Sequence, residues 1–461
     1  MHVTNLNPDA DIGASAWLVD CDGHRLLLDA GTHPQREGRA SLPLYGKAGD
    51  APVEAIALSH CHHDHVGSLP VALRSFPSAH VFMTDLSYFL VERVLHNSVN
   101  VMLRQREEHG IKEYPLYSHE EVDDYAAVFQ GVSYRKEIPW VTFPRGYRGV
   151  SPTLEFFDAG HTLGSAGIRV RGPRHSLFYT GDVCFHDQTL LRAAQFDEVK
   201  ADILIMETTR GNRELAPGFS RESEMERLGT AIEEVLANRG CVLIPAFGLG
   251  RTQEILADMA LWMRAGRWKP RPIQIGGLGR VFTEIYDLQA HRTHRSHSRL
   301  RLTEAVELKV LSPRELAHTK LTGGKIFVMT AGMMSENTGA HDLAMRMMGD
   351  PRQGIFFVGY SAPDSPAGRL RDCPPGGTFR FSESAGDLTR QCRVEGFDLT
   401  AHANREDLVD LVEQVDPKVV ILGHGDAVGR SWFAQEIQKR WPKIRVYQPG
   451  PGETVACLGV G

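Results

Sequence analysis

Four histidines and one aspartate occupy six consecutive positions, 60–65, directly after the short apolar run AIALS. Histidine is the commonest neutral metal ligand, and carboxylates are the commonest anionic ones. The spacing H-x-H-x-D-H places His60 and His62 on one side of an extended chain. The turn that follows lets Asp64 and His65 face a neighbouring position, whereas the remaining cysteine and histidine point the other way. The loop therefore predicts ligands for two adjacent metal ions.

One loop is too short to complete two coordination shells, because a catalytic zinc ion takes about three protein ligands plus water. Three further residues follow apolar runs and lie beside glycine, which permits close backbone approach. They are His161 in FFDAGHTLG, Asp182 in FYTGDV and His424 in VVILGHGD. A single histidine at a strand end is more often structural. Together with the loop, however, these residues complete a predicted set of seven ligands.

The length of the chain and the order of its predicted strands and helices indicate two α/β domains. A length of 461 residues is too great for one simple core. The first two hundred residues read as short strands separated by Gly, Asp and His turns. From about Thr208 strands alternate with amphipathic helices, which favours a parallel sheet flanked by helices. The pattern of predicted strands and helices changes again near Gly376.

Longer motifs resemble a known family. SHCHHDHVG, AGHTLGSAG, YTGDV and LLLDAG resemble the signatures of the metallo-β-lactamase fold. METTRGNR, LIPAFGLGRTQEIL, VMTAGMMSENTG, VGYSAPDSPAGRL and DLTAHANREDL resemble its β-CASP branch, whose members process nucleic acids. The resemblance covers almost the whole chain. It implies an αββα sandwich built from residues 1–207 and 396–461, interrupted by an inserted α/β cap, the β-CASP domain, at 208–395.

The resemblance also implies roles for individual residues. It assigns His60, His62 and His161 to one zinc ion and Asp64, His65 and His424 to a second, with Asp182 bridging both. Asp29 corresponds to the aspartate that supports the metal loop. Glu207 corresponds to the acid that opens the β-CASP region, and His402 to the histidine taken as the general acid. The expected catalytic residues are therefore His402, Glu207, Asp64 and Asp182, with two Zn²⁺ ions as cofactors.

The charge of the chain limits how it can hold a nucleic acid. The net charge is −6 and the isoelectric point is about 6.4, so a polyanion must be held by metal ions or by a local basic patch. Arginine suits phosphate because its guanidinium can bond in a bidentate manner. The predicted substrate contacts are Arg210, Arg213, Arg251, Ser361 and Arg369. The basic stretch 291–302 is expected to be either an RNA-contacting patch or a flexible loop.

The leading functional hypothesis is a zinc-dependent ribonuclease acting on single-stranded RNA, endonucleolytically or from the 5′ end. In the family that the sequence resembles, a histidine at the position of His424 favours RNA over DNA. The alternatives are a single-stranded DNA nuclease, a small-molecule hydrolase of thioesters, lactones or lactams, and a non-enzymatic RNA-binding subunit. RNA and a second copy of the chain are the expected partners, and no membrane is expected. Seven scattered cysteines and the lack of a recognisable signal peptide predict a cytoplasmic location.

Overall fold

The computed structural model describes residues 1–141, 150–382 and 385–458 of the protein. The chain forms two compact units. The first unit contains residues Met1–His186, Ala193–Leu215 and His402–Gly461, and the second contains Asp187–Arg192 and Ala216–Ala401. Residues 208–215 thus belong with the first unit and 396–401 with the second, a few residues away from the boundaries that the sequence motifs suggest.

The first unit contains two seven-stranded sheets. One sheet has the strand order β22 (Thr454–Ala456), β1 (His2–Asn5), β2 (Trp17–Cys21), β3 (His24–Leu28), β4 (Ala55–Ala57), β5 (His80–Thr84) and β6 (Phe129–Val132). The other has the order β21 (Arg445–Tyr447), β20 (Val419–Gly423), β11 (Ile203–Glu207), β10 (Ser176–Tyr179), β9 (Ala166–Arg171), β8 (Thr153–Asp158) and β7 (Ile138–Pro139).

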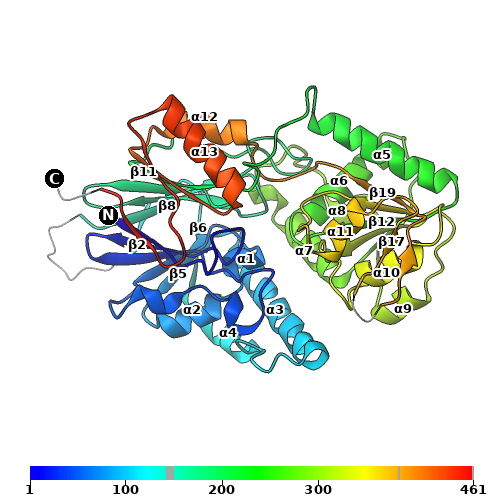
Figure 1. Ribbon diagram of the computed structural model, residues 1–461, viewed down its shortest axis with the longest axis horizontal. Coiled ribbons are helices and arrows are strands. Elements are labelled where there is room, and N and C mark those ends of the chain that lie inside the picture. The colour runs from blue at the N-terminus through cyan, green and yellow to red at the C-terminus, as the bar shows by residue number, and fades with distance from the viewer. Residues whose placement is uncertain (142–149, 383–384, 459–461) are drawn as a thin grey trace. The chain divides into compact units, whose positions relative to one another are not determined.

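The two sheets enclose one apolar core, and helices cover their outer faces (Figure 1). Residues alternate across a strand. Accordingly, Ile203 and Ile205 of β11 join the core between the sheets, whereas Leu204 packs outward against Phe433 of α13 (Ala427–Arg440) and its neighbours. The remaining helices of this unit are α1 (His63–Val66), α2 (Leu69–Ser75), α3 (Tyr88–His109), α4 (His119–Tyr125) and α12 (Arg405–Val415). This arrangement is the αββα sandwich that the motifs imply.

Parallel pairing brings the carboxyl ends of several strands to a common edge in each sheet. β3, β4 and β5 are parallel, so the residues after β3 and β4 leave the first sheet together. In the second sheet β10, β11 and β20 are parallel, and Glu207 at the end of β11 pairs with Gly423 at the end of β20. Ligand-type residues follow these ends: Asp29 after β3, His60 after β4, Asp182 after β10 and His424 after β20.

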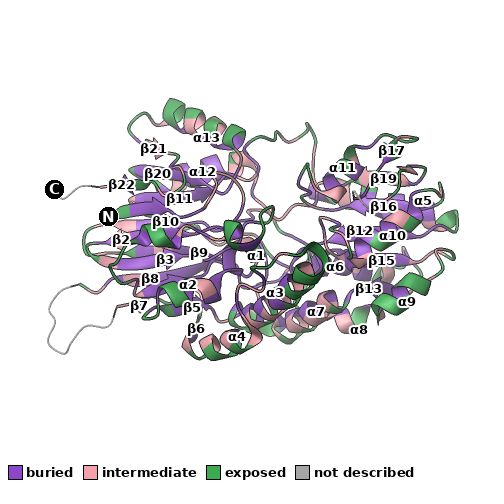
Figure 2. Cartoon of the chain, turned by 60° about the horizontal axis from the view of Figure 1, so that its bottom comes forward, coloured by how far each residue is buried: buried purple, intermediate pink, exposed green. Residues whose placement is uncertain are grey.

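The second unit is built around a parallel six-stranded sheet. Its strand order is β14 (Leu308–Val310), β13 (Ile273–Ile275), β15 (Ile326–Thr330), β12 (Val242–Ala246), β16 (Gly354–Phe357) and β19 (Arg393–Gly396). Its helices are α5 (Arg221–Ala237), α6 (Arg251–Arg264), α7 (Gly277–Leu288), α8 (Leu302–Ala305), α9 (Pro313–His318), α10 (Gly339–Met347) and α11 (Pro366–Asp372), and β17 (Thr378–Phe379) pairs with β18 (Leu388–Thr389). The strands of both units are largely buried (Figure 2). Among the described residues, no helix has the length and apolarity needed to span a bilayer.

Candidate metal centre

The histidine loop and the three distant strand ends come together in the first unit. The seven predicted ligands form two groups whose donor atoms lie within 4.8 Å of one another. One group contains His60, His62, His161 and Asp182, and the other contains Asp64, His65 and His424. The five histidines and Asp64 divide as the resemblance implies, and Asp182, which the resemblance makes the bridge, falls in the first group. The chain thus gathers seven ligand-type side chains from four separate segments.

In the first group, two histidines lie near one carboxylate oxygen and a third lies beside one of them. Nε2 of His60 and Nε2 of His161 each lie 3.6 Å from Oδ2 of Asp182, and Nε2 of His161 lies 3.1 Å from Nδ1 of His62. In the second group, Nε2 of His424 lies 3.3 Å from both Nε2 of His65 and Oδ2 of Asp64. In each group the ligand atoms lie within 4.8 Å of one another, close enough for one metal ion to contact them all.

Asp182 faces both groups. Its Oδ2 is directed at the first group, whereas its Oδ1 lies 3.3 Å from Nε2 of His65 and 3.1 Å from Nδ1 of His424. Burial raises the pKa of this carboxyl, but the charges of His424 and His65 outweigh burial and hold the pKa well below its usual value. Asp182 is therefore an anion with one oxygen for each group, as a bridging ligand requires.

Asp29 fixes the orientation of the loop. This buried carboxylate accepts hydrogen bonds from the amide and the hydroxyl of Ser59, at 2.6 and 2.7 Å, and from the hydroxyl of Tyr179 at 2.7 Å. Its Oδ2 also lies 2.7 Å from Nδ1 of His65. A carboxylate on one ring nitrogen directs the other nitrogen, here Nε2, to the metal position. Asp29 and His424 have φ angles of 61° and 46°, a region that non-glycine residues occupy at an energetic cost and that is typical of functional sites.

The donor chemistry of the site fits a metal. Nε2 of His60 is buried and has no hydrogen-bond partner among the described residues, and an unpaired buried nitrogen of this kind is costly. Burial, together with the positive charge of His65, lowers the pKa of His60 well below its usual value, so its imidazole is neutral. Zinc binds the ring nitrogen of a neutral imidazole that carries no proton. Histidine nitrogens and carboxylate oxygens, of which the set has five and two residues respectively, are among the ligands that Zn²⁺ takes in proteins.

The other two residues of the loop have structural roles, as expected from their position. His63 is held between two hydroxyls, with Nδ1 at 2.7 Å from Oγ1 of Thr32 and Nε2 at 2.6 Å from Oγ of Ser98. Cys61 is buried and directs its thiol to the carbonyl of Ser87 at 3.5 Å. Neither side chain belongs to the two ligand groups.

A further aspartate–histidine group in this unit does not have the chemistry of a metal site. Asp9, Asp11 and His33 lie close together. Nδ1 of His33 accepts a hydrogen bond from the amide of Gln35, so its Nε2 bears the proton and donates it to Asp11. Arg36 pairs with Asp9. The group is therefore a local ion-pair network.

His402 and Glu207 form a pair beside the first ligand group. Nδ1 of His402 lies 3.2 Å from Oε2 of Glu207, and the ring centroids of His402 and His161 are 4.7 Å apart. Oε1 of Glu207 also accepts a hydrogen bond from the amide of Val183 at 2.8 Å, which fixes the carboxylate. Burial lowers the pKa of His402, but the charge and the hydrogen bond of Glu207 outweigh burial and raise it above its ordinary value. Glu207 thus favours the protonated form of this imidazole, which lies beside the ligand cluster.

We expect Glu207→Gln to lower the pKa of His402, because the amide removes the negative charge that stabilises the imidazolium. A raised pKa keeps the acid form present up to higher pH, and activity that needs this form is lost as the pH rises through that pKa. The descending limb of the pH–rate profile should therefore move to lower pH in the variant, with a rate loss of about tenfold or more at neutral pH. An unchanged profile would contradict the role of Glu207.

Gly31 allows the loop to approach β3. A Cβ atom at this position would lie 1.7 Å from the carbonyl oxygen of Asp64, and the amide of Ser15 donates to the same carbonyl at 2.8 Å. We expect Gly31→Ala to displace the loop and to cost several kcal/mol of stability, since overpacking of this kind costs typically about 1–3 kcal/mol even when side chains can move. Thermal melting and metal analysis would check this. Gly46→Ala, where a Cβ atom meets nothing within 4 Å, serves as the control and should behave like the unaltered protein.

The predicted substrate contacts are distributed over both units. In the first unit Arg210 is buried and its charge acts on His402, whereas Arg213 is exposed. In the second unit Arg251 is buried and donates to Oε1 of Gln188 at 3.2 Å, and Ser361 is also buried. Arg369 donates to the carbonyls of residues 380 and 381. Of the five, Arg210 is the one that the structure of the first unit places near the His402–Glu207 pair.

The expected basic patch at 291–302 is smaller than its sequence suggests. Arg295 is buried, its guanidinium donates to the carbonyl of Tyr286, and burial lowers its pKa. Arg301 donates to the carbonyl of Ser298 at 2.9 Å. Only Arg292 and Arg299 of this stretch are exposed arginines. The alternating basic pattern did not reveal that one of its members packs inward.

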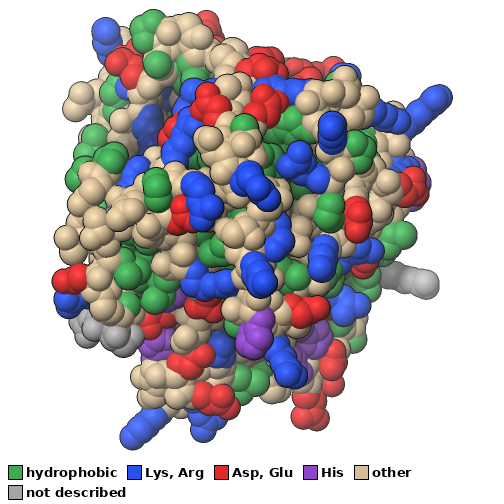
Figure 3. All heavy atoms as spheres, turned by 90° about the vertical axis from the view of Figure 1, so that its right-hand side faces the viewer, with side chains coloured by type: hydrophobic (Ala, Val, Ile, Leu, Met, Phe, Trp, Pro, Cys, Tyr) green, Lys and Arg blue, Asp and Glu red, His purple; other side chains and the backbone are tan. Residues whose placement is uncertain are grey.

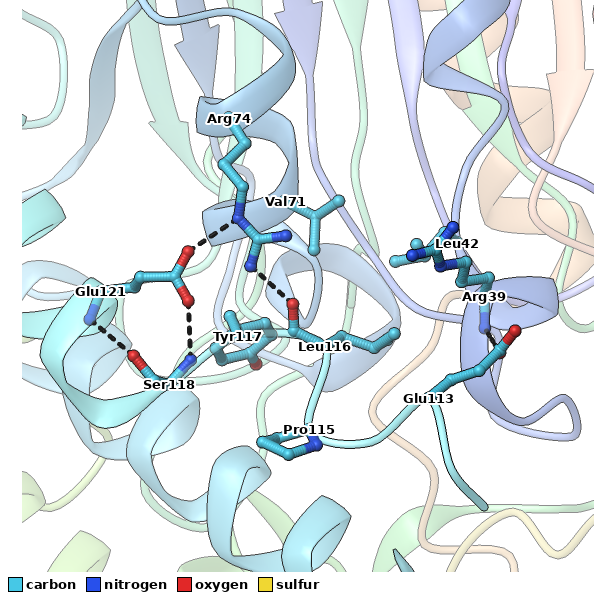
Figure 4. Close-up of a pocket in the computed structure, with 10 residues that line it drawn as sticks. All are labelled: Arg39, Leu42, Val71, Arg74, Glu113, Pro115, Leu116, Tyr117, Ser118 and Glu121. Carbon is cyan, nitrogen blue, oxygen red and sulfur yellow. Dashed lines mark hydrogen bonds and ion pairs between the residues drawn. The ribbon is translucent and has the colours of Figure 1, made fainter.

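A surface pocket of about 560 Å³ lies elsewhere in the first unit (Figure 4). Arg74 crosses it to bond Oε1 of Glu121 and the carbonyl of Leu116, at 2.7 and 2.6 Å. Its lining residues are Arg39, Leu42, Val71, Arg74, Glu113, Pro115, Leu116, Tyr117, Ser118 and Glu121. None of the predicted site residues is among them, so this pocket is distinct from the ligand cluster.

Comparisons with known proteins agree with the fold and the motifs. The metallo-beta-lactamase superfamily matches residues 10–228, the Beta-Casp domain matches 252–370, and the Zn-dependent metallo-hydrolase RNA specificity domain matches 387–449. A crystal structure of a protein of unknown function from Enterococcus faecalis V583 has a TM-score of 0.55 at 13% identity and covers 98% of this chain and 99% of its own.

Curated relatives include Endoribonuclease YSH1 of Eremothecium gossypii, which is 26% identical over 95% of this chain and 58% of its own length. Cleavage and polyadenylation specificity factor subunit 3 of Dictyostelium discoideum is 26% identical over 99% of this chain and 57% of its own length. Endoribonuclease YSH1 of Saccharomyces cerevisiae is 25% identical over 92% of this chain and 54% of its own length. The chain thus spans little more than half the length of these relatives. By its three domains and its ordered motifs, it belongs to the β-CASP branch of the metallo-β-lactamase superfamily.

Proposed function

We propose that this protein is a zinc-dependent ribonuclease that hydrolyses phosphodiester bonds of single-stranded RNA. The observation that carries the proposal is the position of the His402–Glu207 pair, at the edge of a cluster of seven ligand-type side chains. The names of the curated relatives, two of which are endoribonucleases, support RNA as the substrate. The match to an RNA specificity domain at 387–449, which contains both His402 and His424, adds to this support.

The two ligand groups would hold two zinc ions. His60, His62 and His161 would bind one, and Asp64, His65 and His424 the other, with one oxygen of Asp182 for each. A pair of metal ions supplies an activated hydroxide at neutral pH and stabilises the charge that develops on the phosphate oxygens. The chain's own contribution is to fix these ligands through Asp29 and to present the cluster at the carboxyl edges of two sheets.

His402 would donate a proton to the leaving oxygen. Hydrolysis of a phosphodiester releases an alkoxide, which is a poor leaving group until it is protonated. Glu207 orients the imidazole, because both of its carboxylate oxygens lie within hydrogen-bond distance of Nδ1. The positive charge of Arg210 near this pair would help to attract a phosphate group.

The partners and location remain proposals. A second copy of the chain is proposed as a partner on the resemblance to proteins that form homodimers. A reducing compartment such as the cytoplasm is proposed as the location. All seven cysteines are buried and unpaired with one another, which supports a compartment in which disulfides do not form.

The proposal is tested by incubating end-labelled single-stranded RNA and single-stranded DNA with the zinc-loaded protein. Cleavage of RNA, with little cleavage of DNA, is expected, and cleavage should stop when a chelator removes the metal. The product ladder then separates internal cleavage from stepwise removal at the 5′ end. Rapid hydrolysis of a thioester or lactam substrate without any nuclease activity would show instead that the centre serves small molecules.

A further inference from the structure

The amino-terminal edge of the six-stranded sheet carries one basic residue for each of four neighbouring strands. β13, β15, β12 and β16 are adjacent and parallel, so their first residues lie along the same edge. A basic side chain precedes each of these strands by one to three positions: Arg271, Lys325, Arg239 and Arg352, respectively. Neighbouring strands are about 4.8 Å apart, so the four residues form a continuous row.

The loops that carry this row are packed against one another. Nη1 of Arg271 donates to the carbonyl of Gly324 at 3.5 Å, and the amide of Val242 donates to the carbonyl of Lys325 at 2.9 Å. A Cβ atom on Gly240 would lie 1.8 Å from the carbonyl oxygen of Arg352. These close contacts keep the four loops together along one edge of the second unit.

Positive charge exceeds negative charge along this edge. Arg239, Lys269 and Lys320 are exposed, and none of their side chains makes a hydrogen bond or ion pair with another described residue. Arg352 is paired with Asp350, and Glu307 is an exposed acid at the β14 end of the row. Figure 3 looks onto the side of the molecule where the second unit is drawn in Figure 1, and Lys and Arg side chains gather across that face. This local excess contrasts with the net charge of −6 for the whole chain.

We infer that this basic edge binds the phosphodiester backbone of the RNA as a contact additional to the metal centre. The basic edge is defined as Arg239, Lys269, Arg271, Lys320, Lys325 and Arg352. The inference rests on the proposed function, because it takes RNA as the polyanion. A row of cations neutralises consecutive phosphates and releases their counterions, which gives affinity without sequence preference. The basic edge also explains how a chain of acidic overall charge holds a long polyanion.

Charge reversal separates this contact from catalysis. The test variant carries Arg239→Glu, Lys269→Glu and Lys320→Glu, three exposed positions without ion pairs. The control variant carries Arg104→Glu, Arg106→Glu and Lys112→Glu, which are exposed on or after α3 of the first unit and cause the same change in net charge. An alanine version of the test variant gives the effect of removing the charges alone. All three zinc-loaded proteins should melt at the temperature of the unaltered protein.

The KM and kcat of the zinc-loaded proteins are measured on a long single-stranded RNA of about 30 nucleotides and on a short one of about six. For the long RNA, we expect the test variant to raise KM by about tenfold or more, the alanine version to have a smaller effect, and kcat to stay unchanged. The slope of log(kcat/KM) against log[salt] should fall in magnitude by about 2, because each single-strand phosphate contact contributes about 0.7. The short RNA and the control variant should show less than a twofold change.

Equal KM values for the test and control variants on the long RNA would overturn the inference and leave the proposed function standing. If the unaltered protein cleaves no RNA, the proposed function fails, and binding of the labelled long RNA by fluorescence anisotropy then decides the inference separately. Weaker binding by the test variant than by the control would still support a polyanion surface at this edge. Equal binding would overturn the inference.

Discussion

His402→Ala is expected to reduce RNA cleavage by about 10²–10⁴-fold at neutral pH, the usual contribution of a general acid. The loss should appear in kcat, because the imidazole acts on the leaving oxygen and its removal leaves the seven ligand-type residues in place. His402 lies 3.2 Å from Glu207 through Nδ1 and belongs to neither of the two ligand groups formed by the seven predicted ligands. The measurement is single-turnover cleavage of end-labelled RNA together with the zinc content of the same preparation.

The control for this variant is His318→Ala, an exposed histidine at the end of α9. It should cleave RNA like the unaltered protein and bind the same amount of zinc. Full activity of His402→Ala would refute the role of the imidazole. A loss of zinc in that variant would show that His402 is a ligand instead of an acid.

Asp182→Asn is expected to abolish cleavage and to lower zinc affinity at both positions. The amide keeps the volume of the side chain but removes the negative charge that faces both ligand groups, at 3.6 Å from His60 and His161 and at 3.1 Å from His424. Asp29→Asn should have a smaller effect of about 10–100-fold in zinc affinity, since Asp29 belongs to neither ligand group and acts indirectly, through the ring of His65 and through Ser59 of the metal loop. Competition with a chromophoric chelator measures both affinities.

The relative loss of zinc affinity in these two variants tests which carboxylate bridges the two positions. An Asp182→Asn protein that binds two zinc ions as tightly as the unaltered protein would show that Asp182 does not bridge. An Asp29→Asn protein that loses more zinc than Asp182→Asn would show that the hydrogen bonds to Ser59 and Tyr179 matter more than the bridging carboxylate.

Much of the site could be predicted from the sequence because several of its ligand-type residues lie close together in one short motif. The spacing of His60, His62, Asp64 and His65 after an apolar run indicates a metal loop by itself. Each of His161, Asp182 and His424, taken alone, could be either a metal ligand or a structural residue. Their assignment to the same site as the loop depended on the order of the motifs. Parallel pairing of β10, β11 and β20 is what brings the last two together, and strand order is not encoded in any single stretch.

Other features depend on tertiary contacts that carry no sequence signal. Nothing local indicates that Tyr179, the last residue of β10, donates its hydroxyl to Asp29, or that Arg295 packs inward from a basic stretch. The segment Asp187–Arg192 joins the second unit because Glu254 accepts hydrogen bonds from the amides of Leu190 and Leu191. The basic edge is equally invisible in the sequence, since its residues come from separate loops that parallel strands align.

The most direct test of the central claim is a crystal structure of the zinc-loaded protein with anomalous diffraction data at the zinc absorption edge. Two anomalous peaks about 3.5–4 Å apart are expected, the spacing typical of two-metal hydrolases. One peak should lie among His60, His62 and His161, the other among Asp64, His65 and His424, with an oxygen of Asp182 directed at each. The absence of anomalous signal within this cluster, in protein shown to contain zinc, would contradict the account.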